Sequence, residues 1–148
     1  MSGPRAVRTI GLNLLYLVPG KVGGTEVYAR RLVHALACAR PEWRWVAYCG
    51  ADALDGLRAE AWPSSVRLVP SPRPSADKAS RAALELSWLA WRASRDGVQL
   101  MHSLGTTSPL ATRCPRVVTV HDLIYLHYPD TFPQAARIAL KVLVGPGA

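Results

Sequence analysis

A pair of glycines near the start of the chain has the residue types and the position of an anion-binding turn. Residues 20–26 have the sequence Gly-Lys-Val-Gly-Gly-Thr-Glu and connect an apolar segment to an amphipathic one. Adjacent glycines allow the backbone to approach a ligand closely, and a helix that begins here presents free N–H groups to an anion. We therefore predict a phosphate or substrate site at Gly23 and Gly24, with Glu26 beside them. A tight turn without a ligand is the alternative interpretation.

This turn differs from the two commonest phosphate-binding fingerprints. The dinucleotide motif GxGxxG is absent, and about twenty residues further on the chain has Arg44 where that motif requires an acidic residue. The P-loop ending Gly-Lys-Ser/Thr is absent as well. The sequence therefore favours neither an NAD-binding protein nor a P-loop protein.

Two apolar segments lead into a histidine, and these histidines are the second group of candidates. His121 precedes Asp122, and His102 precedes Ser103 and a polar loop. A histidine at the carboxyl end of a strand can hydrogen-bond a sugar hydroxyl or transfer a proton. Adjacent residues of a strand point to opposite faces, so Asp122 need not orient His121, and a structural role for either histidine stays open.

These candidates need a sheet to position them, and the alternation of apolar segments predicts one. Strands are predicted over residues 7–17, 43–48, 66–69, 98–102 and 117–121, and helices over residues 25–39, 79–95 and 134–144. Strands that alternate with helices indicate an α/β fold, here a single Rossmann-like domain with a doubly wound parallel sheet. Ligands bind at the carboxyl ends of the strands in such sheets, which is where the glycine pair and both histidines are expected.

The two longer helices are each expected to bury one face against the sheet. The helix over residues 25–39 has Val27, Leu32, Val33 and Leu36 as its apolar positions, with Arg30 and Arg31 on the polar side. The helix over residues 79–95 has Leu84, Trp88 and Trp91 on one stripe. Apolar residues at helical spacing face the core, and tryptophan in such helices usually packs there. His34 and His127 are interpreted as surface residues.

The composition limits the class of protein and of partner. The chain has 148 residues, 49% of them hydrophobic, which suits one folded domain, and its apolar runs are too short to cross a bilayer. A net charge of +8 favours an anionic partner, but the arginines are scattered. We therefore predict no nucleic-acid role and leave association with an anionic membrane surface open. Three separated cysteines indicate neither a zinc site nor a disulfide framework and favour a cytoplasmic setting.

Taken together, several segments resemble the N-terminal domain of the family 4 retaining glycosyltransferases, which have the two-Rossmann GT-B architecture. The resemblance covers nearly the whole chain, and the segments occur in the order found in the family. They are residues 10–13 (Ile-Gly-Leu-Asn), 23–29 (Gly-Gly-Thr-Glu-Val-Tyr-Ala), 101–103 (Met-His-Ser), 118–124 (Val-Thr-Val-His-Asp-Leu-Ile) and 128–129 (Tyr-Pro).

The resemblance implies a function and a role for each matching residue. Residues 1–148 would be the acceptor-side half of an enzyme that transfers a sugar from a nucleotide-sugar donor to an acceptor. The glycine pair would approach the donor phosphates, and His121 would be the catalytic residue beside the donor sugar, with Asp122 in support. The loop at His102 and Ser103 would shape the acceptor pocket. The resemblance implies no metal or other cofactor.

The same resemblance implies that a C-terminal donor-binding domain lies outside this chain, and that the chain alone is inactive. Two other functions stay open. One is a Rossmann-like nucleotide-binding protein of different function. The other is a non-catalytic domain that binds an anionic partner, either nucleic acid or the inner face of an anionic membrane. The sequence specifies neither the sugar nor the acceptor.

Overall fold

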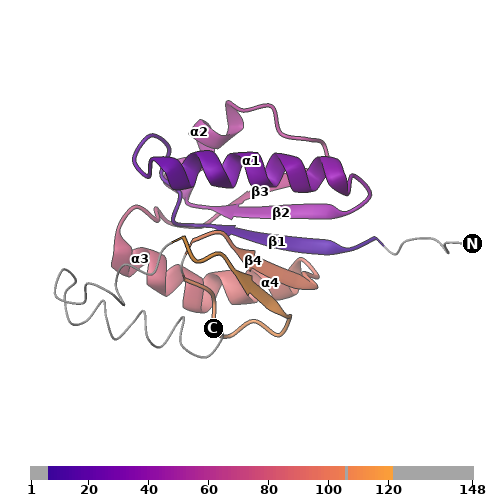
Figure 1. Ribbon diagram of the computed structural model, residues 1–148. Helices are drawn as coiled ribbons and strands as arrows, with labels where there is room; N and C mark the ends of the chain where they lie inside the picture. Colours follow the sequence, from indigo (N-terminus) through magenta and orange to yellow (C-terminus); the bar gives the residue numbers. More distant parts are fainter. Residues whose placement is uncertain (1–6, 106, 122–148) are drawn as a thin grey trace, which may run out of the picture.

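The computed structural model describes residues 7–105 and 107–121, which fold around one parallel sheet (Figure 1). The sheet has five strands in the order β3-β2-β1-β4-β5, and every neighbouring pair is parallel. The strands are β1 (Thr9–Leu14), β2 (Arg44–Cys49), β3 (Val66–Pro70), β4 (Leu100–Ser103) and β5 (Arg116–Val118). This arrangement confirms the predicted α/β class with a Rossmann-like, doubly wound parallel sheet.

Helices cover both faces of the sheet, as is usual for parallel sheets. Figure 1 shows α1 and α2 on one side of the strands, and α3 and α4 on the other. The helical elements are α1 (Gly24–Ala39), the 3₁₀ turn η1 (Ala51–Ala53), α2 (Leu54–Arg58), α3 (Lys78–Ala83), the π-helical turn η2 (Leu84–Leu89) and α4 (Ala90–Arg95). The last three follow one another directly, so they form one helical segment whose middle is π-helical.

The central strand β1 is buried on both faces, which explains its nearly continuous apolar sequence. Leu12 and Leu14 pack with Val33 of α1 in the core cluster on one face. Tyr48 of β2 and Leu89 of η2 belong to the cluster on the other face. A fully buried aliphatic side chain contributes about 1.5–3 kcal/mol to folding. The two clusters therefore fix the strand ends from which the candidate residues extend.

Three of the four predicted apolar residues of α1 face the core, because Val33 is buried and Leu32 and Leu36 pack against the buried cluster, whereas Val27 does not. Ala29, Val33 and Ala37 are buried, whereas Val27 and Tyr28 are 50% and 40% exposed. The small alanine side chains allow the helix to lie close to the sheet, which hydrophobicity alone does not indicate. Val27 and Tyr28 belong to the first turns of α1, and Tyr28 contacts His121 there. Tyr28 thus lies beside the candidate histidine rather than in the core.

The prediction that Trp91 is buried is wrong, because 55% of its surface is exposed. The residues of this segment that face the core are Leu84, Leu89 and Ala93, spaced by five and then four positions. A π-helical turn is closed by hydrogen bonds between residues five apart, so it inserts one residue into the helical repeat. The insertion rotates the buried stripe away from Trp91, which the pattern of a continuous α-helix cannot show.

The predicted strands and the first two predicted helices exist, with ends that differ by at most three residues. The first strand ends at Leu14 because the chain turns there, with the N–H of Leu17 donating to the Leu14 carbonyl at 2.9 Å. The last described strand ends at Val118, so His121 lies after the strand rather than on it. The short helices between β2 and β3 have no counterpart in the sequence prediction. The predicted helix over residues 134–144, and His127, lie outside the described residues.

Candidate functional site

The carboxyl ends of β1 and β4 form the point at which the order of the strands reverses. From β1 the chain moves outward to β2 and β3, and it then returns to β4 on the other side of β1. Ligands of open α/β sheets bind in the crevice at such a switch point. Asn13 and Ser103 are register partners at the ends of these two strands. The glycine turn, which follows β1, and His121, which follows β5, both belong to this carboxyl edge.

The backbone conformation requires a glycine at position 23 but not at position 24. Gly23 is the N-cap of α1 with φ 60° and ψ −130°, a backbone conformation that only glycine adopts without strain. Gly24 is the first residue of α1, and a Cβ at this position would meet no atom within 4 Å. The turn alone therefore explains Gly23. Gly24 faces open space, with no side chain capping the N-terminus of the helix.

The start of α1 is held by the turn after β1. The hydroxyl of Tyr16 donates to the carbonyl of Thr25 at 3.2 Å, and the Thr25 hydroxyl donates to the carbonyl of Val22 at 2.8 Å. Burial, with a smaller contribution from neighbouring acidic groups, raises the pKa of Tyr16 to about 12, so this hydroxyl stays a donor at neutral pH. The free N–H groups of α1 are thus presented in a fixed direction.

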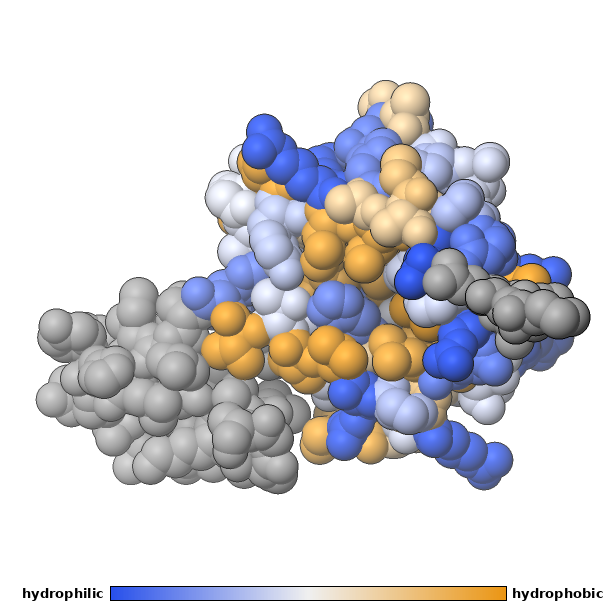
Figure 2. All heavy atoms as spheres, turned by 45° about the vertical axis from the view of Figure 1, so that its right-hand side comes forward, coloured by the Kyte–Doolittle hydropathy of each residue, from blue (hydrophilic) through white to orange (hydrophobic). Residues whose placement is uncertain are grey.

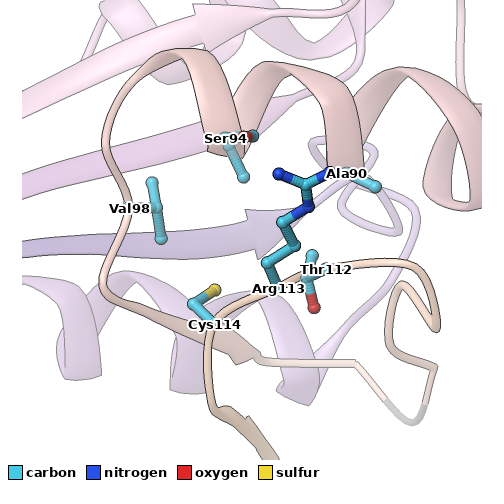
Figure 3. Close-up of a pocket in the computed structure, with 7 residues that line it drawn as sticks. Ala90, Ser94, Val98, Thr112, Arg113 and Cys114 are labelled. Atoms are coloured by element: carbon cyan, nitrogen blue, oxygen red, sulfur yellow. The ribbon is translucent and has the colours of Figure 1, made fainter.

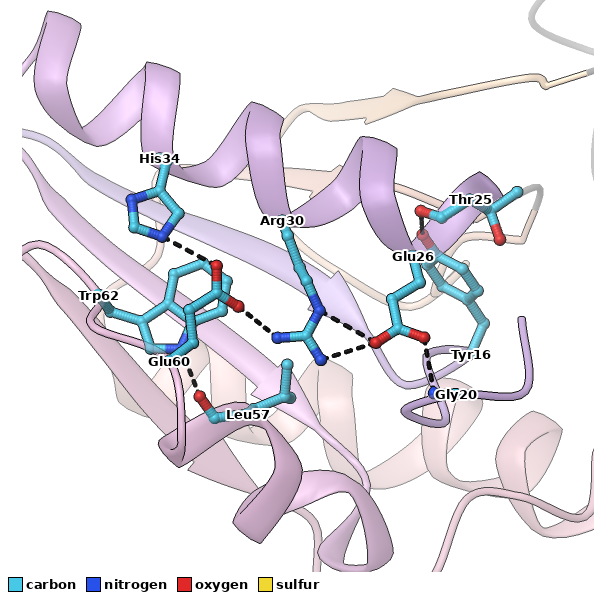
Figure 4. A network of polar contacts seen from close by, with 9 residues as sticks. All are labelled: Tyr16, Gly20, Thr25, Glu26, Arg30, His34, Leu57, Glu60 and Trp62. Atoms are coloured by element: carbon cyan, nitrogen blue, oxygen red, sulfur yellow. Dashed lines mark hydrogen bonds and ion pairs between the residues drawn. The ribbon is translucent and has the colours of Figure 1, made fainter. Parts of the chain in front are cut away.

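Glu26 is engaged within the protein, in the network drawn in Figure 4. One carboxylate oxygen accepts the N–H of Gly20 at 2.8 Å, and the other accepts two bonds from the Arg30 guanidinium at 2.7 and 3.0 Å. Burial acts to raise the pKa of Glu26, but the hydrogen bonds from Arg30 and Gly20 outweigh it and lower that pKa. Glu26 therefore holds the glycine turn in place; direct contact with a substrate stays a prediction.

The same network shows that His34 is not a free surface residue. Arg30 also pairs with Glu60, whose second oxygen lies 3.1 Å from Nε2 of His34. The imidazole stacks on the indole of Trp62 with ring centroids 4.9 Å apart. His34 is therefore a partly exposed surface residue whose side chain is held by Glu60 and Trp62. Its partners lie in the segment between α2 and β3, and no pattern local to α1 indicates them.

His121 is brought to the start of α1. Its Nε2 lies 2.7 Å from the carbonyl oxygen of Leu104, which can only accept, so Nε2 carries the proton. The ring of Tyr28 packs edge-to-face on the imidazole, with centroids 5.1 Å apart. No described residue hydrogen-bonds Nδ1, which in the neutral ring is an acceptor. The structure thus brings together His121 and the helix that begins at the glycine pair.

His102 and Ser103 have partners within the sheet. Nε2 of His102 lies 3.0 Å from the hydroxyl of Thr119, which links β4 to the segment after β5. Burial lowers the pKa of His102, so its neutral form is favoured. Ser103 is fully buried, and its hydroxyl lies 3.4 Å from Nδ2 of Asn13. A role of these two residues in shaping a pocket stays a prediction, and Asp122 lies outside the described residues.

A buried carboxylate that the sequence did not indicate as a site residue lies at the switch point. Glu85 is 6% exposed, and its Oε1 accepts hydrogen bonds from Nδ2 of Asn13 at 3.2 Å and from the Thr107 hydroxyl at 3.0 Å. Burial raises the pKa of Glu85 against the opposing effect of these bonds and of Arg81. The only signal in the sequence is Asn13, a polar residue inside an otherwise apolar strand. It indicates that something polar must lie beside it.

We expect the buried charge of Glu85 to make stability depend on pH. Because the pKa is raised in the folded state, stability is highest when Glu85 is protonated and falls as pH rises through the interval between the unfolded and folded pKa. Glu85→Gln has no carboxylate to ionise at this position. The unfolding free energy of the variant, minus that of the native protein, should therefore increase when the pH is raised from 4 to 7. Urea unfolding of both proteins at both pH values measures this difference. The contributions of the other carboxylates cancel, because both proteins contain them. A difference independent of pH would contradict the buried charge.

A hollow of about 170 Å³ lies at the other edge of the sheet (Figure 3). It is lined by Ala90, Ala93 and Ser94 of α4, by Val98 and by Thr112, Arg113 and Cys114. Val98 precedes β4 and Cys114 precedes β5, so this hollow belongs to the amino ends of the strands. It is therefore separate from the glycine turn and His121.

The role of this site is inferred from its geometry, because no similar protein indicates it. No family model, curated protein or solved structure matches the chain. Within residues 7–105 and 107–121, no three His, Cys, Asp or Glu side chains come together as metal ligands. In the same part of the chain, no helix has the length and apolar character needed to cross a membrane. The candidate site thus consists of backbone N–H groups, one histidine and the buried polar residues beneath them.

Proposed function

We propose that this chain is the acceptor-side, Rossmann-like domain of a retaining glycosyltransferase that uses a nucleotide-sugar donor. The observation that carries the proposal is the contact between Tyr28 and His121. It places a histidine with an available acceptor nitrogen next to the helix that starts at Gly24. An anion-binding helix end and a hydroxyl-binding side chain are the two groups that a sugar diphosphate needs.

The chemistry follows from these positions. The N-terminus of α1 carries positive partial charge and free N–H groups, which favour the diphosphate, most of all when it leaves with additional negative charge. Nδ1 of His121 can accept a hydrogen bond from a hydroxyl of the transferred sugar, because Leu104 fixes the proton on Nε2. The loops after β1 and β4 form the remaining wall. In this proposal a donor-binding domain supplies the rest of the electrostatic stabilisation.

Two alternatives share part of this evidence. A nucleotide-binding protein of another function would use the same helix end, but it has no need of His121. A domain that binds an anionic polymer or membrane would use the net charge of +8. Figure 2 shows hydrophilic side chains separated by a band of apolar ones on the face it presents, rather than one continuous hydrophilic surface. On this face the apolar band interrupts the hydrophilic surface that an extended anionic partner would contact.

The test is a titration of the isotope-labelled chain, followed by NMR, with UDP-glucose, GDP-mannose, NAD and inorganic diphosphate. We expect a nucleotide sugar to shift the signals of Gly23 and Gly24 together with the ring signals of His121. Diphosphate should shift the glycines alone. Shifts that NAD produces equally well would favour the nucleotide-binding alternative. Binding that involves the arginines generally and disappears between 50 and 200 mM salt would favour the anionic-partner alternative.

A further inference from the structure

The buried carboxylate of Glu85 has no part in the proposed reaction, yet it joins both loops of the switch point. The first link runs through Asn13. Its side-chain oxygen accepts the N–H of Leu15 at 3.1 Å, while its amide nitrogen donates to Oε1 of Glu85. The orientation of the Asn13 amide is thus set by Glu85, at 3.2 Å, together with the longer contact to the Ser103 hydroxyl at 3.4 Å. That amide in turn shapes the first residues after β1.

The second link runs through Thr107, whose hydroxyl donates to the same oxygen of Glu85 at 3.0 Å. Thr107 belongs to the loop after β4. The two loops also touch, since a Cβ on Gly105 would lie 2.8 Å from the ring of Tyr16. The carbonyl of Leu104, one residue before Gly105, holds the imidazole of His121. A fixed loop after β4 is therefore a condition for a fixed His121.

Stability alone does not account for a carboxylate in this place. Among the described residues Glu85 forms no ion pair; its bonds come from a neutral amide and a neutral hydroxyl, and Arg81 is the charged group that acts on it through space. A buried charge with such partners costs free energy that an apolar side chain of similar size avoids. Glu85 also belongs to the π-helical turn η2, and π-helical turns occur frequently at functional sites.

We propose that Glu85 is a positioning residue that fixes the two switch-point loops through Asn13 and Thr107, and thereby the carbonyl of Leu104 that orients His121. Its importance for sugar transfer rests on the proposed function. The positioning itself does not, because it is a property of the chain without any ligand. Hydrogen exchange can therefore test it whether or not a nucleotide sugar binds.

The experiment compares hydrogen exchange in the native chain, Glu85→Met and Glu85→Gln, measured by NMR. Methionine keeps the length of the side chain but removes the acceptor, so the amide of Leu15 and the Nε2–H of His121 should exchange about tenfold faster or more. Glutamine keeps an acceptor oxygen and should leave both rates within about twofold of the native values. The amide of Tyr48 in β2 reports global opening and should exchange no faster than in the native chain, because loss of the buried carboxylate does not destabilise the whole fold. Glu60→Gln, which alters the other carboxylate network, is the matched control.

Unchanged exchange at Leu15 and His121 in Glu85→Met would overturn the proposal. Equal acceleration of Leu15, His121 and Tyr48 would also overturn it, because that result means general destabilisation. If Glu85→Met does not fold, Thr107→Val removes the second link with a side chain of the same shape. The exchange of His121 Nε2–H should then rise while that of Tyr48 does not.

Discussion

His121→Ala is expected, on the proposed function, to lower kcat/KM for sugar transfer by about 10²-fold, measured with this domain joined to a donor-binding domain. The estimate is the usual loss when one group that acts on transition-state charge is removed. The physical reason is Nδ1 of His121, which no residue in the described part of the chain hydrogen-bonds, on an imidazole that Leu104 and Tyr28 hold in one orientation. Steady-state kinetics with saturating and limiting donor separate an effect on kcat from one on KM.

His102→Ala is the matched control for this prediction. His102 bonds to Thr119 inside the sheet region rather than facing the start of α1, so its removal should reduce kcat/KM much less. Thermal unfolding of both variants shows whether the domain stays folded. If His121→Ala keeps near-native turnover while its unfolding free energy falls by several kcal/mol, His121 is a structural residue and the site is assigned wrongly.

The sheet could be predicted from the sequence because parallel strands buried on both faces leave an unmistakable local pattern. β1 is an almost unbroken apolar run that ends before the Pro-Gly pair at residues 19–20. Strand alternation with helices then implies the position of the carboxyl edge, and so the neighbourhood of Gly24 and His121. Each of these inferences uses residues close together in the chain, which is why they succeed.

The features that the sequence did not predict depend on contacts between segments that are distant in the chain. Glu85 lies in a helical segment where a glutamate normally indicates a solvated face, and only the π-helical turn directs it toward Asn13. The same turn accounts for the wrong prediction of Trp91. The pairing of Arg30 with both Glu26 and Glu60 likewise connects α1 to a loop thirty residues away. No periodicity within one segment contains this information.

The second large effect is expected at the start of α1. Gly24→Val should weaken binding of the nucleotide-sugar donor about tenfold or more, because a β-branched side chain would occupy the open space through which phosphates reach the helix N–H groups. The fold should tolerate the change, since no atom lies within 4 Å of the added Cβ. Gly24→Ala should have a smaller effect on binding and, in a helix, no cost in stability. Isothermal titration with the donor measures each affinity.

Two control variants, Gly23→Ala and Ala39→Val, separate the steric effect of Gly24→Val on binding from backbone strain and from altered helix propensity. At Gly23 the strained backbone of any other residue should lower the unfolding free energy by about 1–3 kcal/mol, whatever it does to binding. At Ala39, the exposed last residue of α1, a β-branched side chain alters helix propensity far from the glycine turn and should leave donor affinity unchanged. Donor affinity that survives in Gly24→Val would mean that the pair only makes a turn, because then neither glycine is needed for a close approach of the ligand.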